Sequence, residues 1–162
     1  MTAGQTLTLA TIGVATILYV LSVGAWLIHR DRPARISWTV ACAFYLIHVA
    51  AAFQFYHGWS HAAAYQHTAD QTARVIGMSW GGGLYFNYVF TILWIADVVW
   101  WWRGLANYRD RPAWITATIQ WFFAFMFFNA TVVFASGFVR WFGVAATLVL
   151  AGLALRRCGA AC

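Results

Sequence analysis

Residues 7–28 read LTLATIGVATILYVLSVGAWLI, a run of 22 residues without a charged side chain. At a rise of about 1.5 Å per residue, a helix of about 20 residues crosses the roughly 30 Å hydrocarbon layer of a bilayer. The run is long enough to span that layer and too apolar for a helix on the surface of a soluble protein. It therefore predicts a transmembrane helix, and this segment decides the class of the fold.

Four further apolar runs follow the first. They cover residues 36–56, 84–102, 113–135 and 138–155. The last run is the shortest and carries Arg140 near its start, so a four-span arrangement is the alternative. Arg140 and Trp141 suit an interfacial position at the beginning of a span, which favours five spans. The sequence thus predicts one all-α, membrane-embedded domain over residues 1–162, a five-span transmembrane helical bundle with an outer loop at 57–83.

The composition excludes an ordinary soluble domain. Hydrophobic residues make up 63% of the chain and charged residues 9%, whereas soluble domains carry about 45–50% and about 25%. The excess apolar surface has to face lipid or protein, so we expect the lipid bilayer, together with other membrane subunits or further copies of this chain, as partners. The ten basic residues fall in short clusters between apolar runs, so the net charge of +6 does not indicate nucleic-acid binding.

The arginines also predict an orientation. Eight of the ten lie in the first loop, the third loop and the C-terminal segment, and only Arg74 and Arg140 lie elsewhere. Arginine-rich loops tend to stay on the cytoplasmic side of a membrane. We therefore expect an integral protein of the bacterial inner membrane with its N-terminus in the periplasm and its C-terminus in the cytoplasm.

The chain has 11 tryptophans, many of them near the ends of the apolar runs. Indole rings prefer the level of the lipid headgroups, where the apolar ring and the N–H donor are both satisfied. We interpret these residues, Trp38 and Trp101 included, as a belt at the two membrane surfaces.

The motif RDRPA occurs twice, at residues 30–34 and 109–113, each time between two apolar runs. Upstream, TILYV at 16–20 matches TILWI at 91–95. We interpret this pattern as a duplicated helical hairpin followed by one more helix. The alternative is convergence on a common helix-start signal, with Asp and Pro in the first turn. In the alignment of the two copies, Asp97 corresponds to Ser22, and the second hairpin lacks the histidines of the first.

Four of the five histidines lie in the stretch from 48 to 70, HVAAAFQFYHGWSHAAAYQHTAD. His57 and His61 are four residues apart, so on a helix they share one face and can chelate one transition-metal ion. His67 and Asp70 form a second pair on another part of the helix surface and reach the same ion only if the chain bends. We therefore predict a copper or iron site with His57 and His61 as first ligands and His67 and Asp70 as second ones. The alternative is an amphipathic helix in the membrane interface with solvated histidines.

His48 lies near the middle of its predicted span. An ionisable side chain at that depth is costly and is functional by default, so His48 is the predicted cofactor-binding residue. Haem held by two histidines needs a second one at a similar depth, and no other run offers it, so haem is a weaker prediction than a metal ion. The alternative is a neutral histidine hydrogen-bonded between helices; the candidate partners are Asn87, Gln120 and Asn129.

Asp97 is the acidic residue of the third run, near its inner end. We expect it to reach toward the arginine-rich loops and to pair with Arg30, Arg32 or Arg103. A role in a proton path or a site is the alternative.

The sequence contains no nucleotide-binding loop, nucleophile elbow or set of histidine boxes, so it does not decide whether the chain is an enzyme. The function it favours is a transition-metal site on the outer, periplasmic face that serves electron transfer, metal handling or oxidation. The alternative is a non-catalytic structural subunit of a larger membrane protein complex. A carrier of protons or small solutes through His48 and Asp97 ranks third, because few polar groups line the spans.

Overall fold

The computed structural model describes residues 2–159, and every regular element in that range is helical. The helices are α1 (Ala3–Leu27), α2 (Asp31–Ala52), α3 (His61–Ile76), α4 (Gly83–Arg103), α5 (Leu105–Arg109), α6 (Ala113–Phe128) and α7 (Gly137–Gly159). Two π-helical turns, η1 (Phe53–His57) and η2 (Asn129–Val133), extend α2 and α6. The predicted all-α class is confirmed.

Five helices are long and apolar enough to cross a membrane. They cover Ala3–Leu27, Asp31–His57, Gly83–Arg103, Ala113–Val133 and Gly137–Arg157. The predicted five spans are confirmed, and the four-span alternative is wrong. α1 and α2 begin earlier than the apolar runs because polar residues start them: Thr2 and Gln5 form a capping box before α1, and α2 starts at Asp31. The chain therefore has the architecture of an integral membrane protein.

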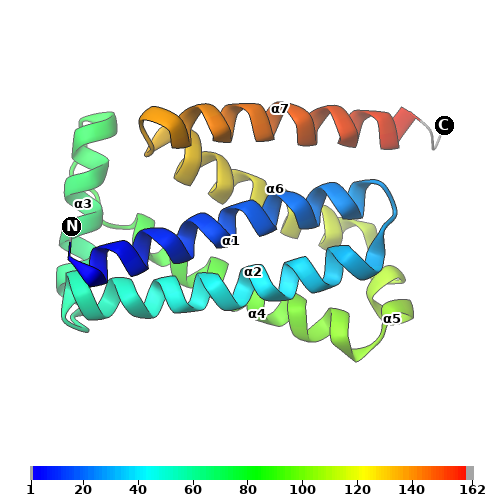
Figure 1. The fold of residues 1–162 in the computed structure, drawn as a ribbon, viewed down its shortest axis with the longest axis horizontal. Helices are drawn as coiled ribbons and strands as arrows, with labels where there is room; N and C mark the ends of the chain where they lie inside the picture. The colour runs from blue at the N-terminus through cyan, green and yellow to red at the C-terminus, as the bar shows by residue number, and fades with distance from the viewer. Residues whose placement is uncertain (1, 160–162) are drawn as a thin grey trace.

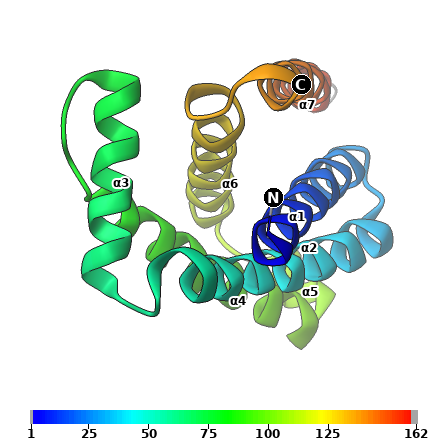
Figure 2. The same ribbon diagram turned by 60° about the vertical axis from the view of Figure 1, so that its left-hand side comes forward.

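The spans run roughly along one direction, and the two termini of the chain lie at opposite ends of the bundle (Figure 1). α1 and α2 form an antiparallel hairpin, α4 packs on α2, and α7 packs on α1 (Figures 1 and 2). α3, which forms within the predicted outer loop, runs across one end of the spans (Figure 1). We call this end of the bundle the α3 end and the opposite end the arginine end.

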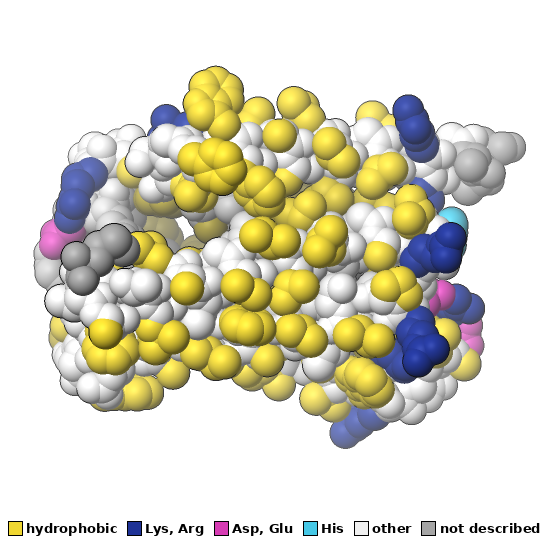
Figure 3. Space-filling view, in the orientation of Figure 1, with side chains coloured by type: hydrophobic (Ala, Val, Ile, Leu, Met, Phe, Trp, Pro, Cys, Tyr) yellow, Lys and Arg dark blue, Asp and Glu magenta, His cyan; other side chains and the backbone are white. Residues whose placement is uncertain are grey.

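Positive charge gathers at the arginine end (Figure 3). Two arginines there pack over indole rings: the guanidinium carbon lies 4.3 Å from the ring centroid both for Arg35 over Trp102 and for Arg157 over Trp26. The indole N–H of Trp102 also donates to the hydroxyl of Thr39 at 2.8 Å, and Arg157 donates to the backbone carbonyl of Trp26 at 3.0 Å. These cation–π and hydrogen-bond contacts tie α2 to α4 and α1 to α7.

Aromatic rings fill the middle of the bundle, where α1, α2, α4 and α6 meet. The ring centroid of Trp38 lies 5.1 Å from that of Trp94 and 5.0 Å from that of Phe123. Small residues in the same cluster leave room for these rings: Ala15, Ala34 and Ala41. The assignment of Trp38 and Trp101 to a surface belt is therefore wrong, since they are only 2% and 3% exposed.

α7 is the least buried of the spans and rests on η2 through Gly143. A Cβ atom placed on Gly143 would lie 2.6 Å from the Cβ atom and 2.9 Å from the carbonyl oxygen of Thr131. Gly152, on the same helix, has no atom within 4 Å of the corresponding position. The absence of a side chain at residue 143 thus permits the closest packing of α7 against η2.

Replacing Gly143 with Val is expected to push α7 away from η2 and to lower the free energy of unfolding by about 1–3 kcal/mol, as overpacking does. Gly152→Val is the matched control, and a change within about 0.5 kcal/mol is expected because its side chain enters open space. Unfolding of the variants in the same detergent measures both effects. Equal stability of the two variants would contradict this role of Gly143.

Candidate functional site

The chain leaves α2 at the α3 end through a left-handed turn. The backbone hydrogen bonds of η1 span five residues instead of four, and the residues that follow have positive φ angles, 54° at Gly58 and 58° at Trp59. A positive φ strains a bulky residue. The indole N–H of Trp59 donates to Gln54 at 2.8 Å, and Ser60 caps α3 with its side chain. These contacts fix the position of His57 relative to α3.

The turn brings His57 against His67 of α3. Their ring centroids are 5.3 Å apart, and the ring planes make an angle of 76°. Nδ1 of His57 is buried and has no hydrogen-bond partner within residues 2–159, whereas Nε2 of His67 accepts a 3.0 Å hydrogen bond from the amide of Gln71. Both histidines are half-buried. Of the predicted metal ligands, these two lie together.

His61 and Asp70 have other partners. Nδ1 of His61 lies 3.0 Å from the hydroxyl of Tyr88, so this histidine links α3 to α4. Asp70 accepts a 3.0 Å hydrogen bond from Gln66, one turn earlier on α3. In the part of the chain that the structure describes, no three His, Cys, Asp or Glu side chains are close enough to hold one metal ion. The structure thus pairs His57 with His67 rather than with His61, and it leaves the four predicted ligands divided.

α3 is a helix of 16 residues within the predicted outer loop. It runs across one end of the spans (Figure 1) and buries one face of small residues, Ala64, Ala69 and Thr72. The chain returns into α4 past the ring of Tyr65, which lies so close to Gly81 that a side chain there would not fit. α3 is therefore packed as part of the bundle and holds His67 in a defined place.

His48 joins α2 to α1. Its Nδ1 atom lies 2.9 Å from the backbone carbonyl oxygen of Thr8. Since a carbonyl oxygen only accepts, Nδ1 of the neutral imidazole carries the proton and donates it, and Nε2 is the unprotonated nitrogen. The predicted partners of His48 were Asn87, Gln120 and Asn129, and this prediction is wrong. The backbone of α1 is nearer because α1 packs along α2 over its whole length.

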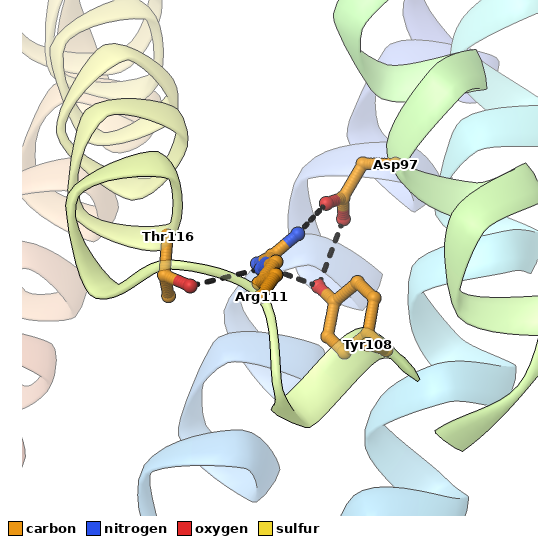
Figure 4. Close-up of polar contacts among 4 residues, drawn as sticks. All are labelled: Asp97, Tyr108, Arg111 and Thr116. Carbon is orange, nitrogen blue, oxygen red and sulfur yellow. Dashed lines mark hydrogen bonds and ion pairs between the residues drawn. The ribbon is translucent and has the colours of Figure 1, made fainter. Parts of the chain in front are cut away.

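A polar network with a buried ion pair at its centre lies near the arginine end (Figure 4). Asp97 of α4 pairs with Arg111 in the loop before α6, and their side chains are 0% and 1% exposed. Tyr108 of α5 donates to Asp97 at 3.0 Å, and Arg111 donates to the Tyr108 hydroxyl at 3.1 Å and to Thr116 of α6 at 2.8 Å. Each charge in the network is paired and hydrogen-bonded, as a buried ion pair requires.

We predicted Arg30, Arg32 or Arg103 as the partner of Asp97, and this prediction is wrong because Asp97 pairs with Arg111. Arg111 reaches Asp97 because α5 folds the connection back against α4, with the ring of Tyr108 stacked on that of Trp101 at a centroid distance of 4.4 Å. Burial, together with the neighbouring carboxylate of Asp97, raises the pKa of Tyr108 well above its ordinary value. Tyr108 therefore keeps its proton and acts as a donor to Asp97.

The two RDRPA motifs meet at the arginine end. Asp31 of the first motif forms an ion pair with Arg109 of the second. Ser22 donates to the carbonyl oxygen of Ala34 in the first motif at 2.8 Å, and its counterpart Asp97 binds an arginine of the second motif. Both returning helices also end in a π-helical turn. These matches support the interpretation of a duplicated hairpin.

A small cavity of about 10 Å³ lies beside the network, lined by Ser22, Trp38, Trp101, Tyr108 and Gln120, among others. The indole N–H groups of Trp38 and Trp101 are buried and have no acceptor within residues 2–159. The lining places the polar side chains of Ser22, Tyr108 and Gln120 beside the rings that carry these two donors.

Sequence reasoning missed Tyr108 and Arg111, because both lie in a segment that looked like a plain connection between spans. One signal could have found Arg111. In the repeat alignment, Asp97 introduces a charge where the first copy has Ser22, and a charge inside a membrane span needs an opposite charge nearby. The second RDRPA motif supplies that charge at Arg111.

Comparisons of the chain with known protein families, with curated proteins and with solved structures give no match. What the chain does therefore has to follow from the chemistry of its own residues.

Removing one partner of the Asp97–Arg111 pair is expected to lower the free energy of unfolding by about 3–5 kcal/mol, because the other charge is left buried and unpaired. In the double variant Asp97→Leu/Arg111→Leu the loss should be smaller than the sum of the two single losses. Arg109→Leu is the matched control: it breaks the exposed pair with Asp31 and should cost about 0–1 kcal/mol. Denaturant titration in detergent measures these values, and equal losses for Arg109→Leu and Arg111→Leu would refute the assignment.

Proposed function

We propose that this integral membrane protein binds one transition-metal ion, copper or iron, between His57 and His67. The observation that supports the proposal is the facing of the two imidazoles at a centroid separation of 5.3 Å, with Nδ1 of His57 unpartnered within residues 2–159. Two imidazoles bound to one ion through bonds of about 2.0–2.1 Å in tetrahedral geometry bring their ring centroids to about 5 Å. The spacing of the two rings therefore suits one ion, which would compete with Gln71 for Nε2 of His67.

Two imidazoles leave coordination positions open. Imidazole nitrogen suits copper and iron, and a site with open positions can take water, a substrate or a further ligand. Such a site serves electron transfer, metal handling or oxidation, the three roles that the sequence analysis favours. His61 and Asp70 are paired with Tyr88 and Gln66, and an ion bound to Nε2 of His67 would take the place of the Gln71 amide.

The arginine distribution supports an external location for this site. Arg74 of α3 and Arg140 in the first turn of α7 lie at the α3 end, and the other eight arginines lie in or near the two connections and the C-terminal turns of α7 at the opposite end. By the positive-inside rule the arginine end faces the cytoplasm. His57 and His67 then face the periplasm of a bacterial inner membrane, on the same side as the N-terminus.

Protein purified after supply of copper or iron is expected to hold about one equivalent of metal in elemental analysis. His57→Ala and His67→Ala should each weaken metal binding by more than about 10-fold. Substitution of a residue that only orients a metal ligand already lowers metal affinity by about that factor, and loss of a ligand should lower it further. His61→Ala is the matched control from the same stretch of sequence and should keep the metal.

Two outcomes would overturn the proposal. One is wild-type protein that stays metal-free after reconstitution, and the other is a His57→Ala/His67→Ala double variant that retains its metal. If His61→Ala loses the metal to the same degree, the ligands are His57 and His61, as the sequence analysis predicts.

One observation supports the second candidate, a structural subunit of a larger membrane complex. Trp121 lies near the middle of the α6 span and is 77% exposed. A tryptophan that faces lipid at this depth leaves its N–H donor unsatisfied, whereas at the membrane surface it finds acceptors. A neighbouring membrane helix that covers Trp121 and supplies an acceptor would satisfy it.

For this second candidate, native mass spectrometry in mild detergent should show additional subunits or further copies at fixed stoichiometry. Trp121→Leu should weaken the assembly by about 10-fold or more, as loss of a central tryptophan does. Trp114→Leu is the control, because Trp114 is 70% exposed but lies at the start of α6. A monomeric mass for the wild-type chain argues against this role.

A further inference from the structure

We propose that a notch between α4 and α5, at the arginine end, binds the phosphate group of an anionic phospholipid. The notch has a volume of about 400 Å³ and is lined by Ala96, Val99, Trp100, Arg103 and Asn107. The notch is separate from the histidine pair, which lies at the opposite end of the bundle (Figure 1).

The shape of the notch is set by the protein itself. α4 ends at Arg103, the chain turns at Gly104, and α5 is held beside α4 by the stack of Tyr108 on Trp101. The same tyrosine is anchored to Asp97 by a 3.0 Å hydrogen bond. The walls of the notch are therefore in place before any ligand arrives, which lowers the cost of binding.

The lining changes from apolar to polar along the span, as a phospholipid does. Ala96, Val99 and Arg103 are spaced by three and four residues and so share one face of α4. The two apolar residues lie toward the interior of the span, and Arg103 lies at its end, with Asn107 of α5 beside it. An acyl chain can follow the apolar part while the headgroup phosphate reaches the polar part.

The polar part of the notch can donate hydrogen bonds to a phosphate and carries positive charge. Arg103 is exposed, and the two ion pairs within residues 2–159 engage Arg109 and Arg111 instead. No carboxylate lines the notch to compete for Arg103. A guanidinium group with a neighbouring amide is a typical donor set for phosphate. Basic pockets of this kind on the cytoplasmic side of membrane proteins suit anionic lipid headgroups.

Thermal stabilisation of the purified full chain in detergent tests the proposal, because a ligand that binds the folded state raises the melting temperature. Three probes are compared: phosphatidylglycerol, phosphatidylcholine and inorganic phosphate. Phosphatidylglycerol should stabilise the protein most. Arg103→Gln should weaken its apparent binding about five-fold, which corresponds to the loss of one arginine near an anionic surface.

Two more variants separate a built site from general charge attraction. Val99→Trp fills the apolar part of the notch without changing the charge and should also weaken the binding of phosphatidylglycerol. Arg32→Gln removes an exposed arginine at the same end, outside the notch, and should leave the binding unchanged. Equal weakening by Arg103→Gln and Arg32→Gln would overturn the proposal. So would equal stabilisation by inorganic phosphate, which would indicate a site for the free ion.

Discussion

The buried pair of Asp97 and Arg111 is the interaction on which the arginine end of the bundle depends. A lone carboxylate inside a membrane span is costly, so α4 requires an opposite charge at this level. The chain meets the requirement by folding the connection between α4 and α6 back on itself, which places Arg111 and Tyr108 against Asp97. The same fold-back sets the position of α5, opens the notch beside Trp100 and fixes where α6 begins.

The ionisable groups at the two ends of the bundle differ in how far they are satisfied. At the arginine end each member of the buried network has partners in the chain, so the network holds the helices together. At the α3 end, His57 keeps a buried nitrogen that no group within residues 2–159 engages. A satisfied network needs no ligand, whereas an unsatisfied imidazole facing a second one offers a place for it. This contrast makes the α3 end the better candidate for chemistry.

The spans could be predicted because their length and apolarity follow directly from the thickness of a bilayer. Local signals at the helix starts, such as Thr2 and Asp31, refine the boundaries but lie outside the apolar runs. Which polar side chains meet could not be predicted in the same way. The partner of Asp97 depends on the fold-back at α5, and the partner of His57 depends on a left-handed backbone at Trp59. Neither feature leaves a periodic signal in the sequence.

The π-helical turn η1 sets the angle at which His57 projects from the helix axis. A π-helical turn accommodates one more residue than an α-helical turn, and one residue corresponds to a rotation of about 100° around the helix axis. Wound as an ordinary α-helix, the same sequence would place Tyr56 where His57 now lies and would turn His57 about 100° further around the axis. Every histidine would still be present in such a chain, yet the two rings would no longer face each other.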